Sequence, residues 1–337
     1  IHMAINVAIN GFGRIGRSIL RALYESNNKE IKIVAINDVG DIKVSALLIK
    51  YDSVHGFFDK SVESNENELI IEGDKIPIYS DRDPTHLDWA KHNVDVVYEC
   101  TGKFTKKEDA KVHIEVGGAK KVIISAPGQN ADSTIVYGVN EDSIGSDDKI
   151  ISNASCTTNC IAPVLKVLNE SIGIDCGFLT TVHSFTNDQR LTDSNHKDPR
   201  RARSATESMI PTKTGAAIAV GDVIPDLKGK LDGYAIRIPI INVSVADLVL
   251  NVKKDTSVEE VNNIIKTACT NEMKNIIDYN ELPLVSKDFN HRAASGVFDS
   301  TLTKVIDKRL VKIFTWYDNE WGFSNRMLDT TLVFMKK

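Results

Sequence analysis

The chain has 337 residues, 42% of them hydrophobic, and a formal net charge of -5 with acids and bases interspersed. This length predicts two domains with large cores, and the charge argues against a nucleic-acid-coating protein. Five irregularly spaced cysteines argue against a disulfide framework and favour a reducing, cytoplasmic compartment. We expect no membrane span and no signal peptide, and we interpret Ile1-His2-Met3 as a cloning remnant.

The N-terminal segment has the pattern of a dinucleotide-binding unit. A β-type run at 5–9 is followed by Gly11, Gly13 and Gly16 in GxGxxG spacing, then by a helical pattern and a second β run at 31–36. The first glycine permits the turn, the second admits a pyrophosphate, and the third lets the helix pack on the strand. Asp38 is then expected to bind the ribose hydroxyls. An ordinary glycine-rich turn is the alternative.

The rest of the first half predicts more strands of the same sheet. Residues 69–78 predict a hairpin, and runs at 94–98 and 121–124 each end in small residues, among them Thr101 and Ser125. Ligands of a parallel sheet lie at the carboxyl ends of its strands. Short runs at 135–137 and 150–151 complete the domain. We therefore predict an α/β fold with a Rossmann-type doubly wound parallel sheet over 1–154.

A cysteine at 156 follows three residues that commonly cap helices, and an apolar helical pattern begins at 161. Cys156 would then lie in the first turn, where the helix dipole and free N–H groups favour a thiolate and could hold an oxyanion. The functional interpretation is a nucleophile. A buried structural cysteine and a metal pair with Cys160 are alternatives, although no second cysteine pair supports zinc, and we predict no metal.

The second half changes to long alternating β runs, at 177–182, 233–238, 243–252 and 311–317. They predict an α+β catalytic domain with a mostly antiparallel sheet over 155–318. Helices are expected at 256–269 and 319–337. The polar stretch 187–208 is long enough to predict a functional loop or a contact with a neighbour.

Several residues of this half suit a base and an anion site. His183 ends a β run, so it could serve a thiol as a base, although a solvated or structural histidine is the alternative. Arg237 lies inside an apolar run, where an unpaired charge is unfavourable. Thr186, Arg201, Thr214 and Gly215 are of types that hold phosphate oxygens. For at least one of Arg200, Arg201 and Arg203, a solvated charge run or a subunit contact is the better interpretation. Hydride transfer from a thiol adduct of an aldehyde to a nicotinamide fits all these parts.

Over nearly its whole length the sequence resembles a known family, the bacterial-type phosphorylating glyceraldehyde-3-phosphate dehydrogenases. The matching segments are INGFGRIGR (9–17), KYDSVHG (50–56), ECTGKF (99–104), ISAPG (124–128), SNASCTTNC (152–160), TTVHSFTNDQR (180–190), HKDPRRAR (196–203), TGAA (214–217) and WYDNEWGFSNRM (316–327). The resemblance implies NAD-dependent oxidation of glyceraldehyde 3-phosphate with inorganic phosphate, in glycolysis, by a cytoplasmic homotetramer.

The resemblance also implies a role for each matching residue. Cys156 is the nucleophile and His183 the base. Arg14, Ile15, Asp38, Arg82, Ser125 and Asn319 bind the dinucleotide. Thr186 and Arg237 hold the substrate phosphate, Ser155, Thr157, Thr214 and Gly215 hold the attacking phosphate, and Arg201 lines the anion region. The loop 187–208 resembles one that reaches the cofactor of a neighbouring subunit. The resemblance also implies that the C-terminal helix 319–337 packs back on the first domain.

Some positions depart from the family pattern and leave alternatives open. Val39-Gly40 and Asn195 lie in the region that excludes a 2′-phosphate, so NAD is preferred over NADP mainly through Asp38. Residues 240–243 and 281–291 are shared with the erythrose-4-phosphate dehydrogenases. The intact Thr214-Gly215 pair argues against that function. A binding protein without turnover is a third alternative, against which Cys156 and His183 argue.

Overall fold

The computed structural model describes residues 4–337, so the interpretation of Ile1-His2-Met3 as a cloning remnant lies outside the described residues. The described chain forms two compact units. The first comprises residues 4–135, 141–154 and 324–337, and the second comprises residues 136–140 and 155–323. Within residues 4–337, no helix combines the length and the hydropathy needed to cross a bilayer.

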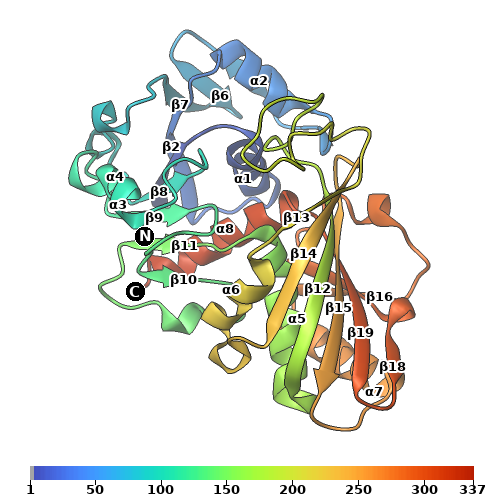
Figure 1. Cartoon of the computed structure of the whole chain (residues 1–337). Helices are drawn as coiled ribbons and strands as arrows, with labels where there is room; N and C mark the ends of the chain where they lie inside the picture. The colour runs from blue at the N-terminus through green and yellow to red at the C-terminus, as the bar shows by residue number, and fades with distance from the viewer. Residues whose placement is uncertain (1–3) are drawn as a thin grey trace. The chain divides into compact units, whose positions relative to one another are not determined.

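The first unit is built on a twisted sheet whose strand order is β10-β11-β9-β8-β1-β2-β7-β6-β5 (Figure 1). Every neighbouring pair from β10 to β7 is parallel, and the β5-β6-β7 edge is antiparallel. Its central strands are continuous apolar runs because both faces of a parallel sheet are covered. Val7, Ala8 and Ile9 of β1 have no exposed surface.

The elements of this unit have the following bounds. The strands are β1 (Ile5–Asn10), β2 (Ile31–Asn37), β3 (Tyr51–Asp52), β4 (Gly56–Phe57), β5 (Val62–Ser64), β6 (Glu68–Ile71), β7 (Asp74–Tyr79), β8 (Val96–Glu99), β9 (Lys121–Ile124), β10 (Ser133–Thr134) and β11 (Ile150–Ser152). The helices are α1 (Arg14–Glu25), α2 (Ile42–Lys50), α3 (Lys107–Ala110) and α4 (Val112–Glu115), and most of α8 (Trp321–Phe334) also belongs to this unit.

One predicted strand of the first half is wrong. Residues 135–137 lie outside any strand, and only Ser133–Thr134 pairs with β11. Ile135 and Val136 are fully buried, and the Ile135 N–H still donates to the Ser152 carbonyl of β11 at 2.8 Å, but no strand continues beyond this bond. The Val136 N–H donates to the Asn140 side chain, which ends the strand direction at this point. The hairpin prediction is confirmed, because β6 and β7 pair across a turn at Glu72 and Gly73, both with positive φ.

The second unit is a mixed sheet in the order β13-β14-β12-β15-β19-β17-β16, with β18 paired to β19. Only β12 with β14 and β16 with β17 are parallel among the pairs of the described residues. The mostly antiparallel sheet and the α/β fold class are therefore confirmed. Figure 1 shows the long strands β12, β14, β15 and β19 side by side, and α5 packs against this sheet.

The elements of the second unit are bounded as follows. The strands are β12 (Ile174–Ser184), β13 (Ile210–Lys213), β14 (Leu231–Ile238), β15 (Ser244–Val252), β16 (Ile277–Asn280), β17 (Gly296–Asp299), β18 (Lys304–Ile306) and β19 (Leu310–Tyr317). The helices are α5 (Cys156–Ile172), α6 (Ala216–Val223) and α7 (Val258–Thr270). Four helices, α2, α3, α4 and α6, have no counterpart among the predicted elements, whereas α1, α5, α7 and α8 do.

Candidate active site

Cys156 is the first residue of α5, where the sequence places it. Ser155 is the N-cap: its backbone is extended and its hydroxyl accepts a hydrogen bond from the Thr158 N–H at 3.0 Å. The apolar face that follows is buried against the sheet, and the left-handed Gly173 ends the helix. The cap and the buried face together fix the position of the Cys156 thiol at the helix N-terminus.

His183 lies near the end of β12, and its Nε2 is 3.6 Å from the Cys156 Sγ. The other ring nitrogen, Nδ1, is 2.7 Å from the Ser184 carbonyl oxygen. Two groups compete at Nδ1: the Ser184 carbonyl, which accepts, and the Arg237 Nη1 at 2.9 Å, which donates. The carbonyl is the nearer of the two, and Arg237 has that same carbonyl as its own acceptor, so we assign the proton to Nδ1 as a donor to Ser184. The lone pair of Nε2 then faces the thiol, which is the arrangement of a general base beside a nucleophile.

Arg237 is brought to this pair by strand pairing. It lies on β14 directly opposite His183 in the parallel β12–β14 ladder. Its Nη1 is 2.9 Å from the His183 Nδ1 and donates to the Ser184 carbonyl at 3.1 Å. The Arg237 Nε is buried without a hydrogen-bond partner. A buried donor of this kind is unfavourable unless a ligand satisfies it, which supports the prediction of an anion site.

Burial and charge act in opposite directions on the Cys156 thiol. Burial raises the pKa of the Cys156 thiol, although Arg237 and the hydrogen bonds from Thr157 oppose this effect. Burial and the neighbouring Arg237 lower the pKa of His183 to about 3. Desolvation thus disfavours charge on both groups, whereas the helix N-terminus and Arg237 favour a thiolate. The proton can pass from Sγ to Nε2 when the sulfur attacks a carbonyl.

Tyr317 is a buried residue at this site that the sequence did not indicate. Its hydroxyl is 2.8 Å from the Thr157 Oγ1 and 2.7 Å from the Thr181 Oγ1. Its ring lies edge-on to His183, with centroids 5.8 Å apart. Burial raises the pKa of Tyr317 well above the usual value for tyrosine, so its hydroxyl stays protonated. Because Tyr317 engages the Thr157 hydroxyl, the predicted phosphate contact of Thr157 is left to its backbone N–H.

The other predicted anion residues differ in how far they are already engaged. The Arg201 Nε donates to the Thr212 hydroxyl at 2.9 Å, and its Nη1 pairs with Asp188. The Thr214 hydroxyl accepts from the Ala216 N–H at 3.2 Å. Gly215 caps α6 and has open space where a Cβ would lie. Thr186 is half-buried in the loop after β12.

Asn319, predicted to orient the nicotinamide, is buried in the second unit. Its Oδ1 accepts from the Ser184 hydroxyl at 2.9 Å and from the Ser244 hydroxyl at 2.8 Å. Two hydroxyl donors fix which end of the amide is the oxygen. The Nδ2 group is then presented as a donor, which is the group that a carboxamide oxygen requires.

The glycine turn of the first unit has the geometry that a pyrophosphate needs. Gly11 has φ +95°, and a Cβ there would lie 2.7 Å from the Thr101 nitrogen. A Cβ on Gly16 would lie 2.4 Å from the Gly11 oxygen, whereas a Cβ on Gly13 would meet nothing within 4 Å. Gly13 is the N-cap of α1, and no side chain caps this helix. The α1 N-terminus thus carries no side-chain cap, and Gly13 leaves room beside it, so the residues fit a dinucleotide.

The remaining predicted cofactor residues surround the same edge of the sheet. Asp38 follows β2, and its two carboxylate oxygens accept only long bonds of 3.3 Å, from the N–H groups of Phe12 and Gly40. Arg14 is engaged by Asp52 through two bonds; although burial raises the Asp52 pKa, the Arg14 bond lowers it to about 2. The Arg14 guanidinium is thus paired within the first unit, and Ile15 follows it in the first turn of α1.

Three further cofactor candidates differ in their surroundings. Thr101 donates to the Glu99 carboxylate through both its N–H and its hydroxyl. The Ser125 hydroxyl donates to the Glu99 carbonyl at 3.0 Å. Arg82 is exposed.

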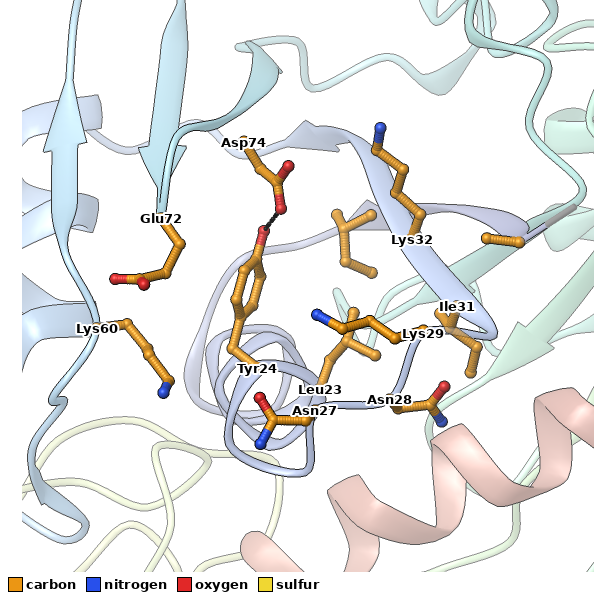
Figure 2. Close-up of a pocket in the computed structure, with 12 residues that line it drawn as sticks. Leu23, Tyr24, Asn27, Asn28, Lys29, Ile31, Lys32, Lys60, Glu72 and Asp74 are labelled. Carbon is orange, nitrogen blue, oxygen red and sulfur yellow. Dashed lines mark hydrogen bonds between the residues drawn. The ribbon is translucent and has the colours of Figure 1, made fainter.

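A cavity of about 420 Å³ lies elsewhere in the first unit (Figure 2). It is lined by the end of α1, the start of β2 and the β6–β7 turn, and the Tyr24 hydroxyl donates to Asp74 across one wall at 2.9 Å. These residues lie at the amino end of β2, whereas Asp38 follows its carboxyl end. The lining mixes Lys29, Lys32 and Lys60 with acidic groups and contains none of the predicted site residues.

Metal chemistry finds no ligand set in the part of the chain that the structure describes. No group of three or more His, Cys, Asp or Glu side chains there is arranged to hold a metal ion. The Cys160 side chain instead lies fully buried, with its Sγ 3.8 Å from the Thr315 carbonyl oxygen. This placement agrees with a structural thiol.

A dinucleotide-binding unit and a buried thiol–imidazole–guanidinium group together define a class, the nicotinamide-dependent oxidoreductases that act through a cysteine. Residues 5–107 match the family model of the NAD-binding domain of glyceraldehyde 3-phosphate dehydrogenase, and residues 155–319 match that of its C-terminal domain. The chain belongs to the glyceraldehyde-3-phosphate dehydrogenase family, and NAD is its cofactor.

Full-length relatives agree with this assignment. A chromosomal glyceraldehyde-3-phosphate dehydrogenase of Cupriavidus necator is 58% identical over 332 residues, covering 98% of each chain. The Pseudomonas aeruginosa glyceraldehyde-3-phosphate dehydrogenase is 54% identical over 331 residues, also covering 98% of each chain. That of Geobacillus stearothermophilus is 54% identical over 330 residues and 97% of each chain. The predicted family and enzyme class are confirmed.

Proposed function

We propose that this enzyme oxidises D-glyceraldehyde 3-phosphate with inorganic phosphate to 1,3-bisphosphoglycerate, as a step of glycolysis, through a covalent intermediate on Cys156. The observation that supports it best is the 3.6 Å contact between the Cys156 Sγ and the His183 Nε2. A thiol and a base at this distance can form and release a thioester, which is the step that conserves the energy of aldehyde oxidation as an acyl phosphate.

The first steps follow from this geometry. The Cys156 sulfur attacks the aldehyde carbon while its proton passes to the His183 Nε2, and the resulting hemithioacetal carries a hydroxyl group. Bound NAD supplies the acceptor for the hydride that leaves this carbon. His183 first gives its proton to the oxygen of the adduct, which makes the hydroxyl group. It then takes the hydroxyl proton back as the carbonyl re-forms, and Cys156 then holds a thioester.

The last step needs a second anion. Inorganic phosphate attacks the thioester carbon, the carbon–sulfur bond breaks, and the sulfur regains a proton from His183. Free N–H groups at the α5 N-terminus, where Thr157 lies, and at the α6 N-terminus, where Gly215 lies, are suited to hold this phosphate. The unpartnered Nε of Arg237, together with Thr186, is suited to hold the phosphate of the substrate.

The test is NADH formation from glyceraldehyde 3-phosphate and from erythrose 4-phosphate, each with and without inorganic phosphate. We expect rapid NADH formation only from glyceraldehyde 3-phosphate with phosphate present. Preference for erythrose 4-phosphate, or a rate that does not depend on phosphate, would contradict the proposal. Thermal stabilisation by NAD without turnover would point to a binding role instead.

We further propose that the protein acts as a homotetramer in the cytoplasm. The loop 187–208 is held by internal ion pairs such as Arg203 with Asp193, yet it exposes 70% of Leu191, and Met209 just after it is 75% exposed. Exposed apolar groups on an ordered loop favour a contact with another chain. All five cysteines are free, which agrees with a reducing compartment. Sedimentation equilibrium should give about four times the chain mass of 37.2 kDa, and cell fractionation tests the location.

A further inference from the structure

A buried carboxylate lies directly beneath the glycine turn of the first unit. Glu99 ends β8 and is 1% exposed. Its Oε1 accepts from the N–H of Thr101 at 2.9 Å and from the Thr101 hydroxyl. Its Oε2 accepts from the Asn10 amide at 2.7 Å and is 2.9 Å from the His113 Nε2. Four donors, from Thr101, Asn10 and His113, thus surround this buried carboxylate.

His113, behind Glu99, is held in one tautomer. The Trp89 indole N–H, which can only donate, is 3.1 Å from the His113 Nδ1. That nitrogen must therefore carry a lone pair, and the proton is on Nε2, where it is donated to Glu99. All three side chains are essentially fully buried. Trp89 and His113 together supply Glu99 with a donor of fixed direction.

This network lies at the switch point of the sheet. The strand order places β1 between β2 and β8, so the chain crosses from one side of β1 to the other between them. Ligands of doubly wound sheets bind at such a point. Asn10 ends β1 and also accepts from the Asn37 amide at 2.8 Å, so one chain of hydrogen bonds joins the carboxyl ends of β2, β1 and β8.

Glu99 is linked mechanically to the turn through Thr101. The Thr101 backbone touches Gly11 so closely that no Cβ fits between them, because it would lie 2.7 Å from the Thr101 nitrogen. A shift of Thr101 is therefore transmitted to Gly11. Asn10, which Glu99 also holds, is the residue immediately before Gly11. Both sides of the turn thus depend on one carboxylate.

We propose that Glu99, with its direction set by His113 and Trp89, is a positioning residue that preorganises the glycine turn for the dinucleotide. The proposal rests on the cofactor role proposed for Gly11, Gly13 and Gly16. In Glu99→Gln the side-chain amide replaces one acceptor with a donor, which must face the donors of Asn10 or Thr101. The turn then loses a fixed support while the shape of the core is retained.

The experiment measures the Kd for NAD and for ADP-ribose by calorimetry. ADP-ribose lacks the nicotinamide, so it reports the turn and the pyrophosphate alone. We expect Glu99→Gln to raise the Kd for both ligands by roughly tenfold or more. The KM for NAD should rise in proportion, while the KM for glyceraldehyde 3-phosphate stays unchanged. His113→Leu, which removes the donor to Glu99, should have the same effect.

Two further variants separate positioning from general stability. His113→Gln keeps one donor for Glu99 and one acceptor for Trp89, so it should restore most of the affinity. Tyr98→Phe is the matched control: Tyr98 is buried on the same strand, and its hydroxyl bonds the Thr331 hydroxyl instead. It should lower the unfolding temperature and leave both Kd values unchanged.

The outcomes are distinguishable from those of the proposed function. Wild-type affinity for ADP-ribose in folded Glu99→Gln would overturn the positioning role. Equal losses in His113→Gln and His113→Leu, or a loss of affinity in Tyr98→Phe, would show a packing effect only and would also overturn it. A wild-type protein that binds NAD but does not oxidise glyceraldehyde 3-phosphate would refute the proposed function and leave the binding comparison valid.

Discussion

At the scale of single residues, burial is the largest influence on the pKa values of both Cys156 and His183. Cys156 lies at a helix N-terminus and beside Arg237, and both favour a thiolate, yet burial raises its pKa. His183 is kept neutral by the same burial and by Arg237. Desolvation therefore disfavours the charged form of both groups, while the helix N-terminus favours the thiolate.

Replacing Cys156 with Ala should abolish turnover while NAD binding persists. Loss of a covalent nucleophile lowers kcat by roughly 10⁴-fold or more. The measurement is steady-state NADH formation together with calorimetry of NAD. Cys160→Ala is the control, because this buried thiol is one turn further along α5 and bonds only the Thr315 carbonyl. Turnover near the wild-type rate in Cys156→Ala would remove Cys156 from its role.

His183 also predicts how stability depends on pH. Its pKa is about 3 when folded and about 6.5 when unfolded, so the unfolded state binds more protons between these values. The stability from the neutral, buried ring is therefore complete above pH 6.5 and is lost as the pH falls towards 3. Between pH 7 and pH 5, the wild type should lose about 2 kcal/mol more than His183→Gln. Denaturant unfolding at both pH values measures this, and parallel curves would contradict it.

At the scale of elements, helix N-termini carry the anion chemistry. The sequence predicted α5 well because a capping residue, a helix and its apolar face are local signals. It missed α2 because the apolar residues Val44, Leu47 and Leu48 of that helix face solvent, so they mark no core-facing stripe. It missed α6 because this short helix is apolar on most sides and is preceded by Gly215.

The α5 cap can be tested independently of the nucleophile. Ser155→Ala removes the acceptor of the Thr158 N–H and should lower the free energy of unfolding by about 1 kcal/mol. Ser155→Asp should restore stability, since aspartate caps helices equally well. Its charge, however, should raise the KM for inorganic phosphate. Unchanged phosphate kinetics in Ser155→Asp would show that phosphate does not bind at this helix end.

The α1 turn gives a pair of glycine variants with opposite expectations. A Cβ on Gly13 meets no atom within 4 Å, and φ is −77°, so Gly13→Ala should fold with unchanged stability. Gly13→Ala should nevertheless weaken the binding of NAD by roughly tenfold or more, because the methyl group occupies the space that a pyrophosphate needs. Gly11→Ala should instead destabilise the fold, since its φ is +95° and Thr101 leaves no room. Calorimetry and thermal unfolding separate the two effects.

At the scale of the whole molecule, contacts between distant segments were the part that the sequence could not supply. Cys156, His183 and Arg237 carried local signals: a cap, a strand end and a charge in an apolar run. Tyr317 did not, because its partner Thr157 is 160 positions away and it ends an ordinary alternating strand. Glu99 and His113 were hidden for the same reason, since only the fold shows that a carboxylate follows β8 beneath the glycine turn.

The proposed tetramer gives a prediction at the same scale. Met209→Arg places a charge on a side chain that is 75% exposed in the single chain. If this surface is covered in the oligomer, the buried charge should shift the mass in sedimentation towards smaller species. Met209→Leu keeps the apolar surface and is the control. A Met209→Arg protein that sediments like the wild type would exclude this position from the interface.

The register of β12 against β14 has a consequence for how the enzyme regains activity when it refolds. His183 and Arg237 are direct partners in that ladder although they lie 54 positions apart in the chain. A slip of one residue would turn either side chain to the opposite face of the sheet. Non-local pairing of this kind forms slowly compared with helices. After dilution from denaturant, the rate at which aldehyde oxidation activity returns therefore reports how fast these two strands pair in the correct register. This recovery of activity should be slower than the recovery of helical circular dichroism.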